Sequence, residues 1–379
     1  MSQDKSTQSV FVLQILRYNM DTPESVYVIT GATHGLGRAC AIELAQRSLG
    51  CVVLACRNRV MAVNLANKIC EEFKVSRGRI IVLEETLDLS EELSVRRYAL
   101  SLSNWLKEER KTITTLINNA GIGGARFSTN SRGYDLVIST NYLGHFLLTI
   151  LLLPYIRGRV VNVSSQNHDP ENGIPGTHPE ISYPQTESEY IGQALYGRVP
   201  LPEGLKAREL RLSRSKLFQI LFTYELSRRI NGSYPQYIAD SVKEVVTNLP
   251  HGNSCNLAEG KSISVIAMCP GALPESNAMS GMFGPTVGFI VWLLIPILRM
   301  IPYCRRYMRT LKESGHHLAN LALFPRDGGT AGFFVDGVAV PSSKFTLSSD
   351  GLTKHAIMLW DLSVQWTNLT EDELKAAGL

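Results

Sequence analysis

The residues with the clearest chemical potential are three glycines, Gly31, Gly35 and Gly37, spaced as G-x-x-x-G-x-G. They lie between the apolar run VYVIT at 26–30 and a stretch with helical patterning. Glycines there let the backbone turn tightly and approach a pyrophosphate, whose charge is met by amide groups and a helix N-terminus. The spacing predicts a dinucleotide-binding turn, with an ordinary glycine-rich turn as the alternative. The other turn residues that we expect to line the cofactor are Thr33, His34 and Leu36.

Two arginines near this turn indicate which dinucleotide it binds. Arg57 ends the second apolar run, in ACRN, at the position where an acidic residue would bind a ribose 2′-hydroxyl. A guanidinium there suits a 2′-phosphate, and Arg38, just after the last glycine, adds positive charge. We therefore predict NADP(H) rather than NAD(H), with a solvated charge at the end of a strand as the alternative for Arg57.

The elements that must position these residues alternate between strand and helix. Apolar, β-rich runs alternate with stretches whose apolar residues recur at helical spacing. We expect strands in 26–30, 51–57, 79–89, 114–121 and 159–165, and helices in 38–48, 61–73, 95–106 and 132–155. Such alternation predicts an α/β fold, a single Rossmann-type doubly wound parallel sheet with helices on both faces.

Composition excludes several other classes of protein. The 379 residues are 44% hydrophobic and 19% charged, which is typical of a globular chain with a sizeable core. The net charge of +4 is small for this length and does not indicate a nucleic-acid binder. The seven cysteines form no CxxC pair and are expected to be reduced, packed thiols. The N-terminus shows no secretory signal, so the expected compartment is the cytoplasm.

We predict no metal site, because the candidate histidines lack partners at metal-ligand spacing. His251 is a lone histidine in a loop, and His316 and His317 are expected on a helix surface.

Several short motifs give the chain a resemblance to a known family. TGATHGLG at 30–37, NNAG at 118–121, VNVSS at 161–165 and PG at 270–271 occur in the order and spacing of the short-chain dehydrogenase/reductase family, over roughly 25–275. ACRN, TNYLGHFLLT, SKLFQILFTYELSRR and KHAIMLWDLS resemble the branch that contains retinol dehydrogenase-like and protochlorophyllide reductase-like enzymes.

The resemblance implies roles for further residues. Asp88 would meet the adenine, and Asn118, Ala120 and Gly121 would line the adenosine side while holding the central sheet. Pro270 and Gly271 would line the nicotinamide end, although PGALPESNAM lacks the threonine that the family places shortly after PG.

The same resemblance implies three catalytic residues. Asn141 would hold a water of the proton relay, Ser165 would hydrogen-bond the substrate oxygen, and Lys216 would contact the nicotinamide ribose. In the family, a tyrosine four residues before this lysine moves the proton, and the lysine lowers the pKa of that phenol. Here that position is Leu212.

Three interpretations of the missing phenol stay open. The acid can be displaced, with Tyr183, Tyr190 or Tyr196 folding over the site, or with Ser213 or a water relaying the proton. The chain can instead be a catalytically inactive NADP(H) binder that acts as a sensor or scaffold. The site can also be adapted to a substrate that supplies its own acid or needs only hydride.

One segment raises a membrane question. The stretch 283–312 is apolar at first and is followed by five Lys and Arg residues, although its apolar part is too short for a confident span. We expect a lid over the substrate pocket. It either rests in a membrane interface and admits a lipophilic substrate, or is buried against the pocket or against a second subunit of a homodimer.

The sequence therefore predicts an NADP(H)-dependent oxidoreductase acting on a lipophilic carbonyl/alcohol pair, cytoplasmic or peripheral on the cytosolic face of an internal membrane. The alternative is a catalytically inactive NADP(H)-binding protein or membrane-associated scaffold. The expected organisation is an N-terminal extension at 1–24, an NADP-binding domain at 25–345 and a C-terminal helical extension at 346–379. The domain carries insertions near 167–208 and 231–260 and the apolar lid near 276–312.

Overall fold

The computed structural model of the chain describes residues 21–123, 126–169, 171, 184–194, 204–235, 237–247, 249, 262–273, 300–301, 307–324 and 331–379. Most of the expected lid, much of both insertions, and Tyr183, Tyr196 and His251 lie outside the described residues.

A sheet of eight strands forms the centre of the molecule, in the order β3-β2-β1-β4-β5-β6-β7-β8. All neighbouring strands are parallel except β7 and β8. The strands are β1 (Ser25–Thr30), β2 (Cys51–Ala55), β3 (Ile80–Ile81), β4 (Thr112–Asn118), β5 (Ile156–Val163), β6 (Ser264–Cys269), β7 (Ala331–Val335) and β8 (Val338–Val340). This confirms the doubly wound parallel sheet. The strand order reverses between β1 and β4, and ligands of such sheets bind outside the carboxyl ends of the strands at that point.

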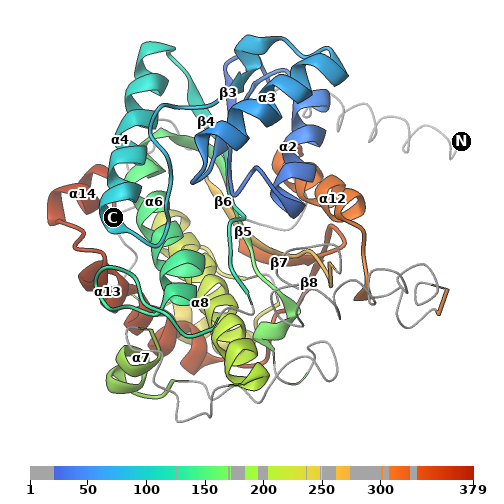
Figure 1. Cartoon of the computed structure of the whole chain (residues 1–379). Coiled ribbons are helices and arrows are strands. Elements are labelled where there is room, and N and C mark those ends of the chain that lie inside the picture. Colours follow the sequence, from blue (N-terminus) through green and yellow to red (C-terminus); the bar gives the residue numbers. More distant parts are fainter. Residues whose placement is uncertain are drawn as a thin grey trace, which may run out of the picture.

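Helices cover both faces of the sheet (Figure 1). One layer contains α2 (Gly35–Arg47), α3 (Arg59–Phe73) and α12 (Leu311–Leu323), and the other contains α4 (Glu92–Glu108), α6 (Gly144–Leu152) and α8 (Leu205–Asn231). The alternation of side chains in a strand explains this arrangement. In β1, Val26 and Val28 pack with the α4, α6 and α8 layer, while Tyr27 and Ile29 pack with the α2, α3 and α12 layer.

The third strand is shorter than the sequence pattern predicts. Only Ile80–Ile81 pairs with β2, although the expected strand ran over 79–89. β3 is the edge of the sheet, and beyond it the chain is held instead by a bond from the Leu87 amide to the Cys56 carbonyl, at 2.9 Å.

The helix expected over 132–155 begins at residue 136 and is not regular. Asp135 caps its start by accepting from the Val137 and Ile138 amides at 2.8 and 3.0 Å. The segment consists of α5 (Leu136–Ile138), a π-helical turn at Ser139–Leu143, α6 and a 3₁₀ turn at Leu153–Tyr155. Such π turns are frequent at functional sites. Among the described residues, Leu136–Tyr155 is also the one helical stretch long and apolar enough to span a membrane, but 83% of its most apolar window is buried, as in the core helix of a soluble domain.

The long helix α8 carries both Leu212 and Lys216, as predicted. It ends at Gly232, which adopts the left-handed conformation (φ 62°) that closes many helices. The described parts of the two insertions contribute α7 (Glu187–Ala194) and α9 (Asp240–Thr247).

The C-terminal residues form a π-helical turn at Asp350–His355, α13 (Ala356–Trp366) and α14 (Glu371–Ala376). Trp360 of α13 stacks on Phe222 of α8, with ring centroids 6.1 Å apart, and contacts Phe146 of α6 edge-on at 5.1 Å. The extension therefore covers the outer side of α6 and α8 and shares their core.

Candidate functional site

The glycine turn after β1 has the geometry of a dinucleotide cradle. Gly31 (φ 67°) and Gly35 (φ 50°) both adopt the left-handed region that favours glycine. A Cβ on Gly37 would lie 2.4 Å from the Gly31 carbonyl oxygen, so this glycine is needed for the close packing of helix against turn. The residue types that the sequence singled out are thus required by the backbone itself.

The first turn of α2 presents free amide groups to this edge of the sheet. His34 is the extended N-cap residue, its side chain makes no capping bond, and the first turn contains no acidic residue. An uncapped helix N-terminus binds anions through its amides and the helix dipole. Leu36 is buried in the core and therefore offers only its backbone, while Thr33 Oγ1 lies 3.0 Å from His34 Nδ1.

Thr30 and Asn119, which the sequence interpretation did not select, join β1 to the NNAG segment. Thr30 Oγ1 accepts from the Asn119 and Ala120 amides, both at 2.9 Å. Asn119 Nδ2 donates to the Thr30 carbonyl at 2.8 Å. Ala120 is half-buried beside Gly31, and the next residue, Gly121, is exposed. Their role on the adenosine side stays a prediction.

Asn118 points into the core. Its Nδ2 donates to Thr149 Oγ1 at 2.9 Å and to Asn162 Oδ1 at 2.8 Å, and Asn162 in turn donates to Thr223 Oγ1 at 2.9 Å. These bonds tie β4 and β5 to α6 and α8, which fits the predicted role of Asn118 in holding the central sheet.

Two cations at this edge have no acidic partner among the described residues. Arg57 is exposed beyond β2, Arg38 is half-buried on α2, and neither forms an ion pair within the described chain. By contrast, the neighbouring Arg59 is paired with Glu84. Asp88 is half-buried, and its Oδ1 accepts from the amide and the hydroxyl of Ser90. Arg38 and Arg57 can therefore meet a phosphate without first breaking an ion pair.

Lys216 is held firmly inside the site. Its side chain is buried, and Nζ donates to the Val163 carbonyl at 2.7 Å and to Gln219 Oε1 at 3.1 Å. Burial lowers the pKa of Lys216 from its ordinary value to about 8. Its third N–H has no acceptor among the described residues and is available to a ligand oxygen.

Asn141 lies in the π-helical turn and is fully buried. Its side chain exchanges two hydrogen bonds with the backbone of Ile122, at 2.8 and 3.0 Å, and donates to Ser215 Oγ at 3.0 Å. Its backbone carbonyl accepts from Gln219 Nε2 at 2.7 Å and contacts His145 Nδ1 at 3.0 Å. Asn141 and Lys216 are thus brought together through Gln219, a residue that the sequence interpretation did not select.

Ser165 follows β5 at the same sheet edge. Its Oγ accepts from the Asn167 amide at 3.1 Å, which leaves its hydroxyl hydrogen free to reach a substrate oxygen. The preceding Ser164 donates to the Lys216 carbonyl at 2.9 Å, so the end of β5 is fixed against α8.

Of the three tyrosines considered as replacements for the missing phenol, Tyr190 is the one that the structure describes. Tyr190 is fully buried, its hydroxyl lies 3.1 Å from His355 Nδ1, and its ring packs 5.7 Å from Phe218. Burial raises its pKa far above the ordinary value. Tyr190 is therefore a core residue, and the hypothesis that it folds over the site is wrong. Ser213 Oγ is buried without a hydrogen-bond partner in the described chain.

The PG turn after β6 is anchored on two sides. Gly271 (φ 78°) is left-handed, and Ser314 Oγ of α12 donates to the Pro270 carbonyl at 2.7 Å. Arg309 lies over Gly271, where a Cβ would meet its guanidinium at 2.4 Å, and Arg309 pairs with Asp336. In the sequence, Arg309 is one of the five cations of 283–312, and no motif indicates its contact with the PG turn.

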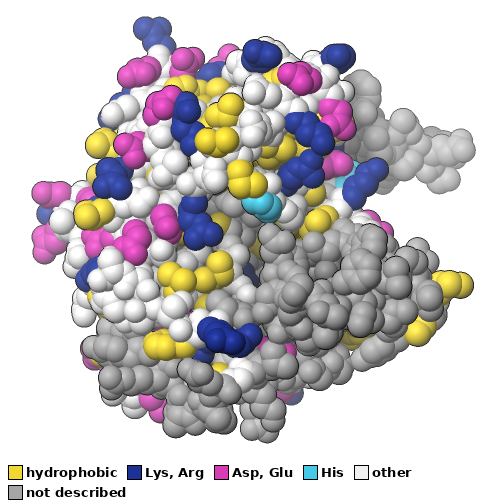
Figure 2. All heavy atoms as spheres, in the orientation of Figure 1, with side chains coloured by type: hydrophobic (Ala, Val, Ile, Leu, Met, Phe, Trp, Pro, Cys, Tyr) yellow, Lys and Arg dark blue, Asp and Glu magenta, His cyan; other side chains and the backbone are white. Residues whose placement is uncertain are grey.

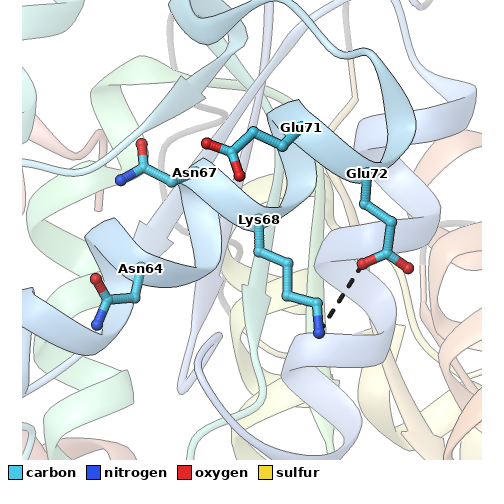
Figure 3. Close-up of a pocket in the computed structure, with 5 residues that line it drawn as sticks. All are labelled: Asn64, Asn67, Lys68, Glu71 and Glu72. Atoms are coloured by element: carbon cyan, nitrogen blue, oxygen red, sulfur yellow. Dashed lines mark ion pairs between the residues drawn. The ribbon is translucent and has the colours of Figure 1, made fainter.

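A shallow hollow on the outer face of α3 carries no such chemistry. Figure 3 shows that its lining side chains all come from this one helix: Asn64, Asn67, Lys68, Glu71 and Glu72. Lys68 and Glu72 form an exposed ion pair at 3.9 Å, which is typical of a solvated helix surface. Among the described residues, no group of three or more His, Cys, Asp or Glu side chains could hold a metal ion.

Comparisons with known proteins agree with this geometry. Residues 25–176 match the family model of the short chain dehydrogenases. The chain is 34% identical to retinol dehydrogenase 14 of Mus musculus over 272 residues, which is 68% of this chain and 69% of that protein. It is 36% identical to retinol dehydrogenase 11 of Homo sapiens over 215 residues, 56% of this chain and 58% of the relative's length.

Solved structures share the fold. An uncharacterized protein from Mycobacterium paratuberculosis has a TM-score of 0.58 at 26% identity, covering 92% of this chain and 94% of the other. A short-chain dehydrogenase from Shigella flexneri has a TM-score of 0.51 at 15% identity, covering 84% and 98%.

Proposed function

The chain belongs to the short-chain dehydrogenase family, in its retinol dehydrogenase-like branch, and on this premise we propose that it is an NADP(H)-dependent oxidoreductase that interconverts a lipophilic alcohol and its carbonyl. The family binds nicotinamide cofactors. The observation that carries the proposal is the convergence of the glycine turn, the free N-terminus of α2 and Lys216 at one edge of the sheet.

The residues of the turn fit the cofactor. A pyrophosphate meets the amides of α2, and the left-handed glycines let it approach the backbone. Arg57 and Arg38 favour a 2′-phosphate over a bare hydroxyl, because both guanidinium groups lack an acidic partner in the described chain. Both bonds from Ser90 go to Oδ1 of Asp88, so Oδ2 of this carboxylate is available to an adenine. These contacts support NADP(H) as the preferred dinucleotide.

The chain's own residues can also orient a substrate. A bound nicotinamide supplies or takes the hydride, and the protein must then manage one proton on the substrate oxygen. Ser165 has a free hydroxyl hydrogen for that oxygen, and Lys216 keeps one N–H outside its bonds to Val163 and Gln219. Because burial brings the pKa of Lys216 to about 8, this ammonium group can hold or release a proton near neutral pH.

The substrate class rests on the relatives and on the sequence. The relatives are named as retinol dehydrogenases, which act on a long apolar alcohol, and the stretch after the PG turn is strongly apolar. We propose a lipophilic substrate that enters under this lid, with the protein in the cytoplasm or peripheral on an internal membrane through 283–312. Deleting 286–301 should release membrane-attached protein into the soluble fraction.

A second function is favoured by one observation. Tyr190 is locked in the core, and Leu212 of α8 stands where the resemblance would place the catalytic phenol. The chain would then be a catalytically inactive NADP(H) binder that acts as a sensor or scaffold. Lys216 is compatible with this function too, since it also serves cofactor binding.

Turnover separates the two functions. Purified chain is incubated with NADPH and a panel of retinoid, steroid and long-chain aldehydes, and oxidation of NADPH is followed by absorbance. The enzyme should oxidise NADPH with at least one aldehyde, and Lys216→Ala should abolish turnover while leaving measurable cofactor binding. A wild type that binds NADPH and never turns over is the inactive binder.

A further inference from the structure

Gln219 lies between Lys216 and Asn141, the residue that the resemblance assigns to the relay water. Its Oε1 accepts from Lys216 Nζ at 3.1 Å, and its Nε2 donates to the Asn141 carbonyl at 2.7 Å. The side chain is 1% exposed, so both bonds are sheltered from solvent. These partners fix the orientation of the Gln219 carboxamide, because an ammonium only donates and a carbonyl only accepts.

These bonds belong to a longer buried chain. The Asn141 carbonyl also contacts His145 Nδ1 at 3.0 Å, and His145 Nε2 lies 2.8 Å from Thr30 Oγ1. Since a carbonyl can only accept, Nδ1 carries the hydrogen and Nε2 accepts from the Thr30 hydroxyl. Burial lowers the pKa of His145 to about 4, so the ring is neutral in this arrangement. The polar chain thus runs from the dinucleotide turn to Lys216 with every member paired.

A carboxamide cannot do what a water does at this place. A water passes a proton by accepting one and releasing another, whereas an amide N–H is a very weak acid and its nitrogen accepts poorly. We propose that Gln219 is a positioning residue for Lys216 and that its amide closes the proton route from Lys216 to the Asn141 carbonyl. The inference rests on the proposed function, and it says where the substrate's proton comes from.

In this arrangement, protons can reach Lys216 from one side of the site only. With Val163 and Gln219 accepting two of its hydrogens, Lys216 is left with one N–H. In the reduction of a carbonyl, hydride adds to carbon from the nicotinamide and a proton adds to oxygen. That proton comes from Lys216 or from a water on the Ser165 side of the site, and the lysine is reprotonated by solvent from that same side.

The first test measures how Gln219 affects the titration midpoint of Lys216. The chain is labelled with ¹³Cε-lysine, and the Lys216 signal is assigned by its loss in Lys216→Arg. Gln219→Glu should raise the titration midpoint of Lys216, because a carboxylate then faces the ammonium, and Gln219→Leu should lower it. Thr223→Val is the matched control. Thr223 lies one turn further along α8, accepts from Asn162 and donates to the backbone carbonyl of Gln219, so its loss leaves the Gln219 side chain and its bond to Lys216 in place.

This first test needs no turnover and no cofactor. Midpoints in Gln219→Glu and Gln219→Leu that equal those of Thr223→Val and wild type overturn the proposal. Thermal unfolding of each variant checks that the chain is folded. A wild type that binds no NADPH would remove the proposed function but would leave this readout of Gln219 intact.

The second test asks whether the route is closed. Leu212→Tyr supplies the phenol that the family uses, and Gln219→Ala leaves room for a water between Lys216 and Asn141. The double variant should reduce aldehydes at least roughly 10-fold faster than Leu212→Tyr alone, since a general acid with a connected relay contributes on the order of 100-fold or more. Equal, measurable turnover in the two chains overturns the closed route, whereas zero turnover in both, with NADPH bound, overturns the proposed oxidoreductase activity.

Discussion

At the scale of single residues, Lys216 determines how the site responds to pH. Burial lowers its pKa to about 8 from an ordinary value of 10.5, so the ammonium is charged below pH 8 and neutral above it. Only the charged form attracts the anionic cofactor and offers three N–H donors. NADPH affinity should therefore fall as the pH rises through about 8. Fluorescence titration with NADPH from pH 6.5 to 9.5 checks this. In Lys216→Met, the fall in NADPH affinity near pH 8 should disappear.

Arg57 carries the prediction on cofactor choice. Replacing it by Glu removes the guanidinium and repels a 2′-phosphate, so NADPH affinity should fall by about 10- to 100-fold, the usual value of a charge-assisted hydrogen bond. NADH affinity should change little or improve. The matched control is Arg59→Glu, because Arg59 already pairs with Glu84 in the described chain. Equal losses for NADPH in both variants would contradict the role of Arg57.

Some of these residues could be predicted from the sequence and others could not. The glycines and Lys216 belong to local motifs whose spacing is constrained by backbone geometry or by a helix. Gln219 acts across 78 positions on Asn141, and Asn119 acts across 89 positions on Thr30. Such roles depend on which strands become neighbours, and no local pattern encodes that.

At the scale of elements, the turn between β1 and α2 tolerates no added side chain at Gly37. Gly37→Ala places a methyl group 2.4 Å from the Gly31 carbonyl oxygen and 2.5 Å from Asn119 Nδ2. The turn must then open, which should cost about 1–3 kcal/mol of stability and most of the NADPH affinity. Gly78→Ala is the control, since nothing lies within 4 Å of its added Cβ. Denaturant unfolding and NADPH titration measure both effects, and a Gly37→Ala chain with normal affinity would contradict the account.

Regular elements were predictable because their apolar periodicity is strong, and irregular ones were not. α8 runs as a single helix through the motif that contains Lys216, as its pattern indicates. The π-helical turn at Ser139–Leu143 has no sequence signature, and it results from packing that turns Asn141 toward Ile122 and Ser215. The edge strand β3 is short because it pairs on one side only.

At the scale of the whole molecule, the C-terminal helix α13 completes the domain. Trp360 is 3% exposed, stacks on Phe222, and carries the Arg229 guanidinium 4.4 Å above its ring. Trp360→Ala should therefore lower the free energy of unfolding by about 3–5 kcal/mol. Leu100→Ala, at a site 63% exposed on α4, should cost little. Equal unfolding midpoints in urea for the two variants would show that α13 is dispensable.

The surface is consistent with a small-molecule site. Acidic and basic side chains are mixed over the described face that Figure 2 shows. The chemistry is concentrated at the carboxyl edge of the sheet, where β1, β4, β5 and β6 each end in a segment that the site uses.

Calorimetry of the purified full chain with NADPH and with NADH tests the central claim most directly. We expect one NADPH per chain, bound at least roughly 10-fold more tightly than NADH, because one 2′-phosphate meets guanidinium groups that have no other acid to bind. Absence of any heat with either nucleotide would contradict the nucleotide-binding turn and, with it, the proposed activity.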